Sequence, residues 1–243
     1  MKKLILNFNS KDSKKIKNPK NFLGGKGANL SEMGRMGLPV PPGFTISTKV
    51  CEIFYKDKKR LNKSLISQIK KELKLIEKDV SKKFGDLKNP LLLSVRSGAR
   101  VSMPGMMDTI LNLGLNDKTV KALAIKTSNG RFAKDSYRRF IQMYGNVVMG
   151  VEGYHFEELI ENYKLTKGVL LDTDLDESDW DGLIEDFKRT VREKAKKDFP
   201  QDVHEQLLGA ISAVFLSWES NRAKVYRKLN QIPAEWGTAV NVQ

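Results

Sequence analysis

The sequence has little of what holds small secreted proteins or metal sites together, with one cysteine and two histidines in 243 residues. A single cysteine, Cys51, excludes a framework of internal disulfides and is typical of a reducing compartment. Because Ser47 or Thr48 can begin a helix just before it, Cys51 is expected to be an inert core thiol. The two histidines, His155 and His204, fall in different helical segments without clustered cysteine or carboxylate partners, so no metal site is predicted.

Long apolar runs are also absent. Residues 1–8 have a charged beginning but too short an apolar run for a signal peptide. No other stretch approaches the length of a membrane span. The sequence therefore predicts a cytoplasmic protein with no membrane partner.

Acidic residues are in deficit, because 43 Lys and Arg against 29 Asp and Glu give a net charge of +14. Such an excess indicates either nucleic-acid binding or lysines spread over solvated faces. The lysines between residues 56 and 83 fall on the non-apolar side of a helical pattern, without the interleaved aromatic residues on which single strands stack. We therefore expect no nucleic-acid partner, and a basic chain also suits a polyanionic substrate.

The hydrophobic fraction, 40%, is enough for a core. Up to residue 115, strand and helix patterns alternate. Strands are expected at residues 4–8, 91–95 and 109–113, extended backbone at residues 40–46, and helices at residues 28–36 and 61–84. From Asn116 onward the 3.6-residue periodicity is almost continuous, until residues 238–242 read as the start of a strand.

These patterns predict an α+β fold in three parts. The first part, 1–115, contains strands and helices; the second, 116–201, is all helical; the third, 202–243, returns to the first. Residues 238–242 are expected to expose an unpaired strand edge, since nothing follows them in the sequence to supply a partner. For the same reason the chain is expected to be an N-terminal fragment.

Two glycine-rich segments carry cations. In the first, Gly24-Gly25-Lys26-Gly27 precedes a helix, and the free N–H groups of a helix start attract anions. The spacing is compatible with a phosphate loop and equally with an ordinary helix start, and the Walker pattern is absent.

The second segment follows the apolar run of residues 91–95. That run leads to Arg96 and Arg100 in a loop broken by Gly98, Pro104 and Gly105. Glycine lets backbone N–H groups approach phosphate oxygens, and arginine offers a planar fork of donors. The segment therefore favours an anion site.

These segments, with residues 39–48, 131–145 and 236–243, resemble the pyruvate, phosphate dikinase family over nearly the whole chain. Phosphoenolpyruvate synthases share the Gly-Gly-Lys-Gly and Val-Arg-Ser elements. The run Ser-Met-Pro-Gly-Met-Met-Asp-Thr at residues 102–109 is what favours the dikinases.

The resemblance implies a partial ATP-grasp domain with an inserted all-helical subdomain, which binds ATP and Mg²⁺. It implies five site residues: Lys26, Arg96, Gly105, Met107 and Arg139. Lys26 and Arg96 would neutralise the polyphosphate during catalysis, while the backbone at Gly105 and Met107 would contact the phosphates. Arg139 stands beside Arg138 on one expected helix, so one of the two is compatible with simple solvation.

The resemblance also implies an overall reaction in which ATP, phosphate and pyruvate interconvert with AMP, pyrophosphate and phosphoenolpyruvate. The metal ligands would lie in a second ATP-grasp lobe, and a phosphohistidine domain and a pyruvate-binding barrel would follow in a homodimeric enzyme. All of these lie outside the sequence, so the chain alone is expected to be inactive. Two alternatives stay open: a phosphoenolpyruvate synthase-like enzyme, and a non-catalytic remnant or binding module.

Overall fold

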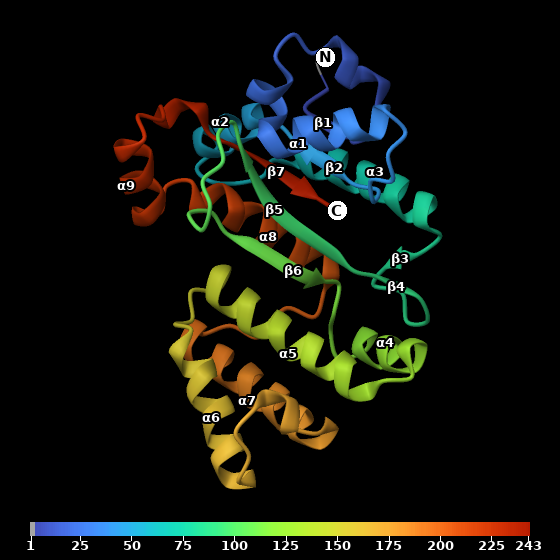
Figure 1. Ribbon diagram of the computed structural model, residues 1–243, viewed down its shortest axis with the longest axis vertical. Helices are drawn as coiled ribbons and strands as arrows, with labels where there is room; N and C mark the ends of the chain where they lie inside the picture. Colours follow the sequence, from blue (N-terminus) through green and yellow to red (C-terminus); the bar gives the residue numbers. More distant parts are fainter. Residues whose placement is uncertain (1–2) are drawn as a thin grey trace. The chain divides into compact units, whose positions relative to one another are not determined.

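The computed structural model describes residues 3–243, which form two compact units (Figure 1). The first unit comprises Met1–Ser81, Leu93–Thr109 and Leu208–Gln243, and the second comprises Lys82–Leu92 and Ile110–Leu207. Helices and an antiparallel sheet are both present. The prediction of a mixed helical and β-sheet fold is confirmed at this level.

Four antiparallel strands pair within the first unit, in the order β1-β2-β7-β5. They are β1 (Ile5–Asn7), β2 (Phe44–Ile46), β7 (Thr238–Val242) and β5 (Leu93–Ala99). On the β5–β7 ladder Arg96 lies opposite Asn241, and on the β2–β7 ladder Thr45 lies opposite the same residue. These two ladders place Thr45, Asn241 and Arg96 in one row, with their side chains on one face.

The expected exposed edge at residues 238–242 is wrong, because β7 is an inner strand. It pairs with β2 on one side and with β5 on the other, and all five of its residues are buried. The partners that the sequence analysis did not find, β2 and β5, lie upstream of β7. Both of its backbone edges are therefore satisfied within the first unit.

The helices of the first unit are α1 (Pro19–Arg35), α2 (Thr48–Lys56), α3 (Lys63–Val80) and α9 (Asn221–Leu229), with 3-10 turns η1 (Lys11–Lys15) and η3 (Ala234–Trp236). In α3 the expected apolar stripe is buried, but the helix ends before Phe84 because Ser81 adopts a left-handed conformation at φ 52°. Helix α1 begins at Pro19, well before the expected residue 28, since proline suits a first helical position.

The second unit is mainly helical. Its helices are α4 (Thr119–Thr127), α5 (Gly130–Val147), α6 (Tyr154–Lys167) and α7 (Glu177–Ala195), with a 3-10 turn η2 (Asp172–Asp174). The short strands β3 (Lys83–Phe84) and β4 (Pro90–Leu91) pair in parallel, and β6 (Thr109–Leu113) lies where expected. The apolar run of residues 91–95 is thus divided between β4 and β5. Helix α8 (Val203–Ser217) contributes residues to both units.

Aromatic packing and a capping box stabilise the helical part of the second unit. Trp180 and Phe187 of α7 are completely buried, and the ring of Phe187 meets that of Phe156 at 4.9 Å. Asp176 caps α7 by accepting hydrogen bonds from the N–H groups of Ser178 and Asp179. Within residues 116–201 the structure has no strand.

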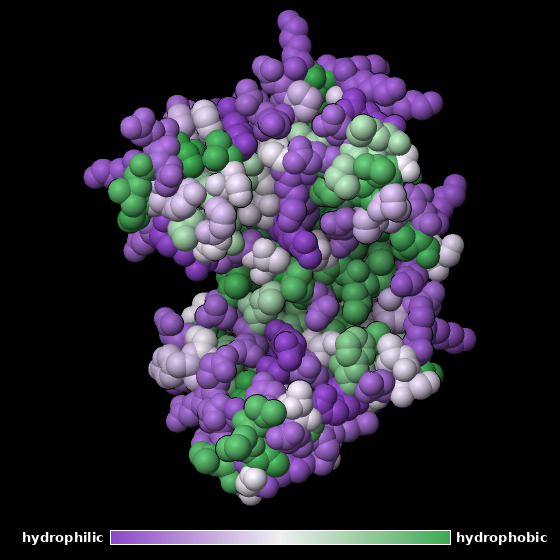
Figure 2. Space-filling view, viewed as in Figure 1, coloured by the Kyte–Doolittle hydropathy of each residue, from purple (hydrophilic) through white to green (hydrophobic). Residues whose placement is uncertain are grey.

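Charged and polar residues cover much of the surface drawn in Figure 2, as the lysine-rich composition predicts. None of the helices within residues 3–243 has the length and apolarity needed to cross a membrane. Cys51 is buried in α2, and this burial raises the pKa of its thiol to about 11, so the thiol is protonated at neutral pH.

The inner position of β7 generates a stability prediction. Val240 is completely buried, so Val240→Asp places a carboxylate in the core without a partner and should lower the free energy of unfolding by about 4 kcal/mol or more. The matched control is Val225→Asp on α9, because Val225 is 59% exposed. Urea unfolding followed by circular dichroism measures both variants. Equal stabilities would contradict the inner placement of β7.

Candidate functional site

The glycine-rich segment of α1 lies against the backbone of β5. Gly24 interrupts the helix with φ 68° and ψ 170°, and a Cβ atom there would come within 1.6 Å of the carbonyl oxygen of Gly98. No side chain fits at that distance, so the position requires glycine for its conformation and for the close approach. The helix resumes after Gly24, and the expected turn before a helix is therefore present as a break inside α1.

Lys26 is the one residue of the segment 24–27 that has a side chain, and the charge of a second cation acts on it. Partial burial and then the positive charge of Arg96 lower the pKa of Lys26 below its ordinary value. Neither Lys26 nor Arg96 forms an ion pair with a carboxylate in the described part of the chain. The charge of Arg96 thus acts on Lys26, and neither cation has a carboxylate partner among the described residues.

Arg96 lies within β5, although the sequence placed it in a loop. The strand continues to Ala99 because Arg96, Ser97, Gly98 and Ala99 all pair with β7. The Nε atom of Arg96 is buried and has no hydrogen-bond partner among residues 3–243. An unpaired buried donor is costly, and an anion beside Lys26 would satisfy it.

Asn241 adds a polar group that the sequence analysis missed. Its side chain is 2% exposed, and its Oδ1 accepts a hydrogen bond of 2.8 Å from the Oγ1 of Thr45. Its Nδ2 is buried without a described partner. Glycine at positions 27 and 98 leaves room for this pair, since a Cβ at Gly98 would lie 2.6 Å from the Nδ2. The sequence offers only a weak signal for Asn241, which is a single amide side chain within an apolar strand.

The loop that follows β5 is held by a small apolar cluster. Met103 is buried with Trp218 and Ala223, and Met106, Met107 and Trp236 pack against this cluster. Gly105 is exposed and has φ 72°, with nothing near the position of its missing Cβ. Met107 is therefore anchored through its side chain, while Gly105 provides the turn at the outer part of the loop.

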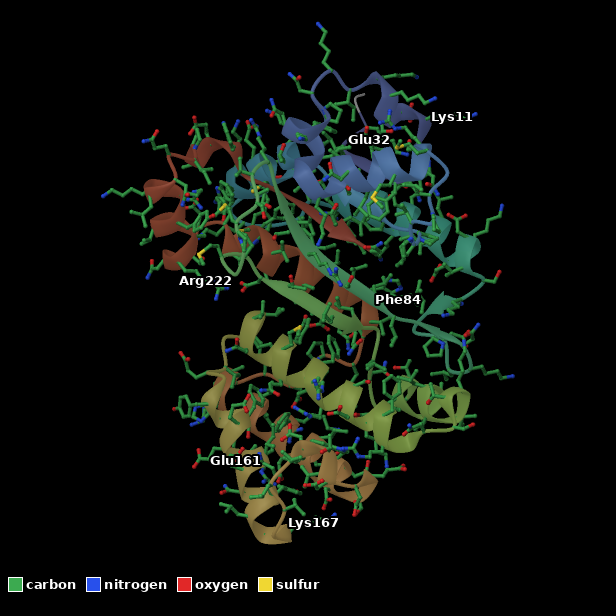
Figure 3. The ribbon with its side chains drawn as sticks, in the orientation of Figure 1. Lys11, Glu32, Phe84, Glu161, Lys167 and Arg222 are labelled. Atoms are coloured by element: carbon green, nitrogen blue, oxygen red, sulfur yellow. The ribbon has the colours of Figure 1, made fainter. Side chains whose placement is uncertain are left out.

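Arg222, at the start of α9, also holds this loop (labelled in Figure 3). Its Nε donates a hydrogen bond of 3.2 Å to the carbonyl oxygen of Met106, and its guanidinium forms an ion pair with Asp108. The N–H of Asp108 donates to the Oγ of Ser217 at 3.3 Å. Asp108 thus orders the loop through these contacts. The sequence analysis did not find Arg222, because an exposed arginine on a helix carries no motif.

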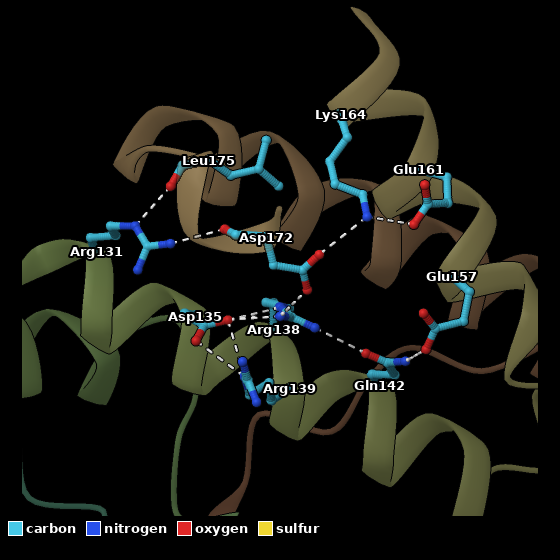
Figure 4. A network of polar contacts seen from close by, with 10 residues as sticks. All are labelled: Arg131, Asp135, Arg138, Arg139, Gln142, Glu157, Glu161, Lys164, Asp172 and Leu175. Carbon is cyan, nitrogen blue, oxygen red and sulfur yellow. Dashed lines mark hydrogen bonds and ion pairs between the residues drawn. The ribbon is translucent and has the colours of Figure 1, made fainter. Parts of the chain in front are cut away.

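Arg139 lies on α5 in the second unit, where Figure 4 shows it beside a polar network. It is exposed and pairs with Asp135 at 3.1 Å. Its neighbour Arg138 is buried, hydrogen-bonded to Asp135 and Gln142, with its guanidinium 4.5 Å from the ring centre of Trp180. Of the two adjacent arginines, Arg138 is therefore the packing residue and Arg139 the solvated one.

The described residues contain no group of three or more His, Cys, Asp or Glu side chains arranged to hold a metal ion. Both histidines pack on aromatic rings instead. His155 lies 4.0 Å from the ring of Tyr154, and His204 lies 5.8 Å from the ring of Phe84. The site in the first unit therefore offers cations and donors, which suit an anionic ligand.

Comparison with known proteins gives one matching family, described as "Pyruvate phosphate dikinase, AMP/ATP-binding domain", over residues 20–71 and 57–243. Pyruvate, phosphate dikinase of Clostridium symbiosum is 54% identical over 225 residues, which are 92% of this chain and 26% of that protein. The Rhizobium meliloti (strain 1021) dikinase is 50% identical over 100% of this chain and 27% of its own length. The chloroplastic dikinase of Flaveria pringlei is 52% identical over 100% of this chain and 25% of its own length.

The chain thus spans about a quarter of the length of these curated relatives.

The Lys26–Arg96 pair generates a prediction on stability against pH. The folded chain binds the Lys26 proton less tightly than the unfolded chain does, so the charged lysine opposes folding at neutral pH. This opposition fades as pH rises from the lowered pKa towards the ordinary 10.5. Lys26→Met should therefore raise the thermal midpoint at pH 7 and lose that advantage near pH 10.5.

Lys20→Met, at an exposed position of the same helix, is the control and should change the unfolding free energy by less than about 0.5 kcal/mol. Differential scanning calorimetry at several pH values compares the three proteins. Destabilisation by Lys26→Met at pH 7 would show that Lys26 has a stabilising partner and is not strained by Arg96.

The contacts of Arg222 generate a second prediction. Arg222→Ala should speed amide hydrogen exchange of residues 103–108, because the carbonyl of Met106 and the carboxylate of Asp108 both lose their partner. The loss of stability should stay near 1 kcal/mol or below, since the ion pair is partly exposed. Lys228→Ala on the same helix is the control. Unchanged exchange in the loop would refute the anchoring role of Arg222.

Proposed function

Because the chain belongs to the pyruvate phosphate dikinase AMP/ATP-binding domain family, we propose that its first unit holds the polyphosphate of ATP between Lys26 and Arg96. The observation that supports this most directly is the pair of cations without a described carboxylate partner, one of which carries a buried, unpaired Nε. An ATP phosphate would supply the missing negative charge and accept the free hydrogen bond.

In this proposal each side chain has a distinct task. Lys26 places a compact charge on the phosphates, and Arg96 offers a planar fork of N–H donors from a rigid strand. Backbone N–H groups at Gly105 and Met107 would approach the transferring phosphate from the loop that Arg222 holds. For Arg139, which is exposed on α5 of the second unit, the likeness to the family supports a phosphate-binding role. Phosphoryl transfer depends mainly on such positioning and charge stabilisation.

The finer architecture is part of the proposal. Residues 1–115 and 202–243 would form one ATP-grasp subdomain, and residues 116–201 would be its inserted helical subdomain. The Mg²⁺ that accompanies ATP would be held by the second ATP-grasp lobe. The described residues contain no group of three or more His, Cys, Asp or Glu side chains arranged to bind a metal ion.

The activity of the whole protein is also a proposal. It would convert ATP, phosphate and pyruvate into AMP, pyrophosphate and phosphoenolpyruvate in the cytoplasm, as a homodimer with phosphohistidine and pyruvate-binding domains. Its support is the identity of 50–54% to proteins named pyruvate, phosphate dikinase. Because these relatives are named as dikinases, the comparison favours this reaction over that of a phosphoenolpyruvate synthase.

Isothermal titration calorimetry of this chain with ATP and Mg²⁺ tests the site. Lys26→Ala and Arg96→Ala should each weaken ATP binding about tenfold or more, since a hydrogen bond to a charged group contributes about 1.5–3 kcal/mol. AMP should be less sensitive to both changes, because it lacks the β and γ phosphates. Lys20→Ala is the control for general charge loss.

Equal ATP affinities for the unaltered chain and for both variants, with circular dichroism showing intact folds, would reject the proposed phosphate site. If Lys20→Ala weakened ATP binding as much as Lys26→Ala and Arg96→Ala do, the result would show only a dependence on net charge.

A further inference from the structure

The first unit contains a cavity of about 1160 Å³ that neither Lys26 nor Arg96 lines. Its walls come from the start of α1, from α2, from η3 and from the residue that follows β5. Among the lining side chains are Asn21, Thr48, Tyr55, Arg100 and Trp236. The volume slightly exceeds the usual range of small-molecule sites, about 300–1,000 Å³. It is large enough for a ligand with a ring system.

Arg100 gives this cavity a specific polar wall. Its Nε is buried and has no hydrogen-bond partner among the described residues. Its guanidinium lies 5.1 Å from the centre of the Trp236 ring, and burial lowers its pKa although Glu235 opposes the shift. A planar cation is thus fixed on an aromatic ring with one donor unused, which suits an anionic group beside a flat ring.

The charge of the lining favours an anion as well. Its cations are Lys17, Lys49, Lys56, Lys59, Lys224 and Arg100, against three carboxylates, Glu52, Glu219 and Glu235. Glu52 is already paired with Lys49 and Lys56, and Glu219 with Lys224. Lys17, Lys59 and Arg100 form no ion pair with a described residue. The cavity therefore keeps positive charge that its own carboxylates do not neutralise.

We propose that this cavity is a second binding site, for a small organic anion that carries a flat ring. Its acidic group would accept the hydrogen bond from the Nε of Arg100, and its ring would lie against Trp236. The exposed Lys17 and Lys59 would attract the anion. The site is separate from the one proposed for ATP, and it does not depend on that function.

The probe for this site is 8-anilinonaphthalene-1-sulfonate, a flat aromatic anion whose fluorescence rises in an apolar pocket. A titration should saturate at one molecule per chain. Arg100→Gln should weaken binding about tenfold or more, because it removes the charged donor. Lys26→Met should bind the probe as the unaltered chain does, which separates this result from any failure of the ATP site.

A charge reversal on the surface covers the case in which Arg100→Gln does not fold. Lys59→Glu should weaken the probe several-fold, while Lys58→Glu should not, since both are exposed with a positive φ but only Lys59 lines the cavity. Equal affinities for Lys58→Glu and Lys59→Glu, or several weakly bound molecules in every variant, would overturn the proposal.

Discussion

The contact between the backbones of α1 and β5 is the constraint on which the candidate site depends. At Gly24 the two main chains are so near that even a methyl group would collide with the carbonyl of Gly98. Because the helix is held at this distance, Lys26 is brought under the influence of Arg96 on the sheet. A side chain at Gly24 would push α1 off the sheet and separate the two cations. The close approach at Gly24 and Gly98 therefore positions Lys26 relative to Arg96, whether or not the glycines themselves touch a ligand.

The sequence predicted that most of the helices and strands exist, but it did not predict which strands pair with one another. Residues 109–113 and 238–242 are strands with the expected bounds, because short β-branched and apolar runs between turn residues favour extended backbone. The pairing of β7 could not be predicted, since its partners β2 and β5 are distant in sequence and a period of two does not name a partner. The end of α3 was misplaced because Phe84 continues the apolar stripe that Ser81 interrupts.

The sequence likewise predicted some residues of the candidate site and missed others. Lys26 and Arg96 were found from their motifs, and the lowered pKa of Lys26 shows that they influence one another. Asn241 was missed because its importance depends on the register of β7 with β2 and β5, which places it between Thr45 and Arg96. Arg222 was missed because its two partners on the loop are set by tertiary packing. The family motifs name the candidate residues, and they do not reveal the residues that pack around them.

The inner position of β7 affects how the protein is made. Strand β5 precedes β7 by roughly 140 residues, which take on the order of ten seconds to synthesise at about 5–20 residues per second. During that time β2 and β5 lack the strand that joins them, so their apolar residues stay uncovered while the second unit emerges from the ribosome. The second unit is continuous apart from Lys82–Leu92 and can fold first. The sheet of the first unit therefore closes only after the second unit has been synthesised.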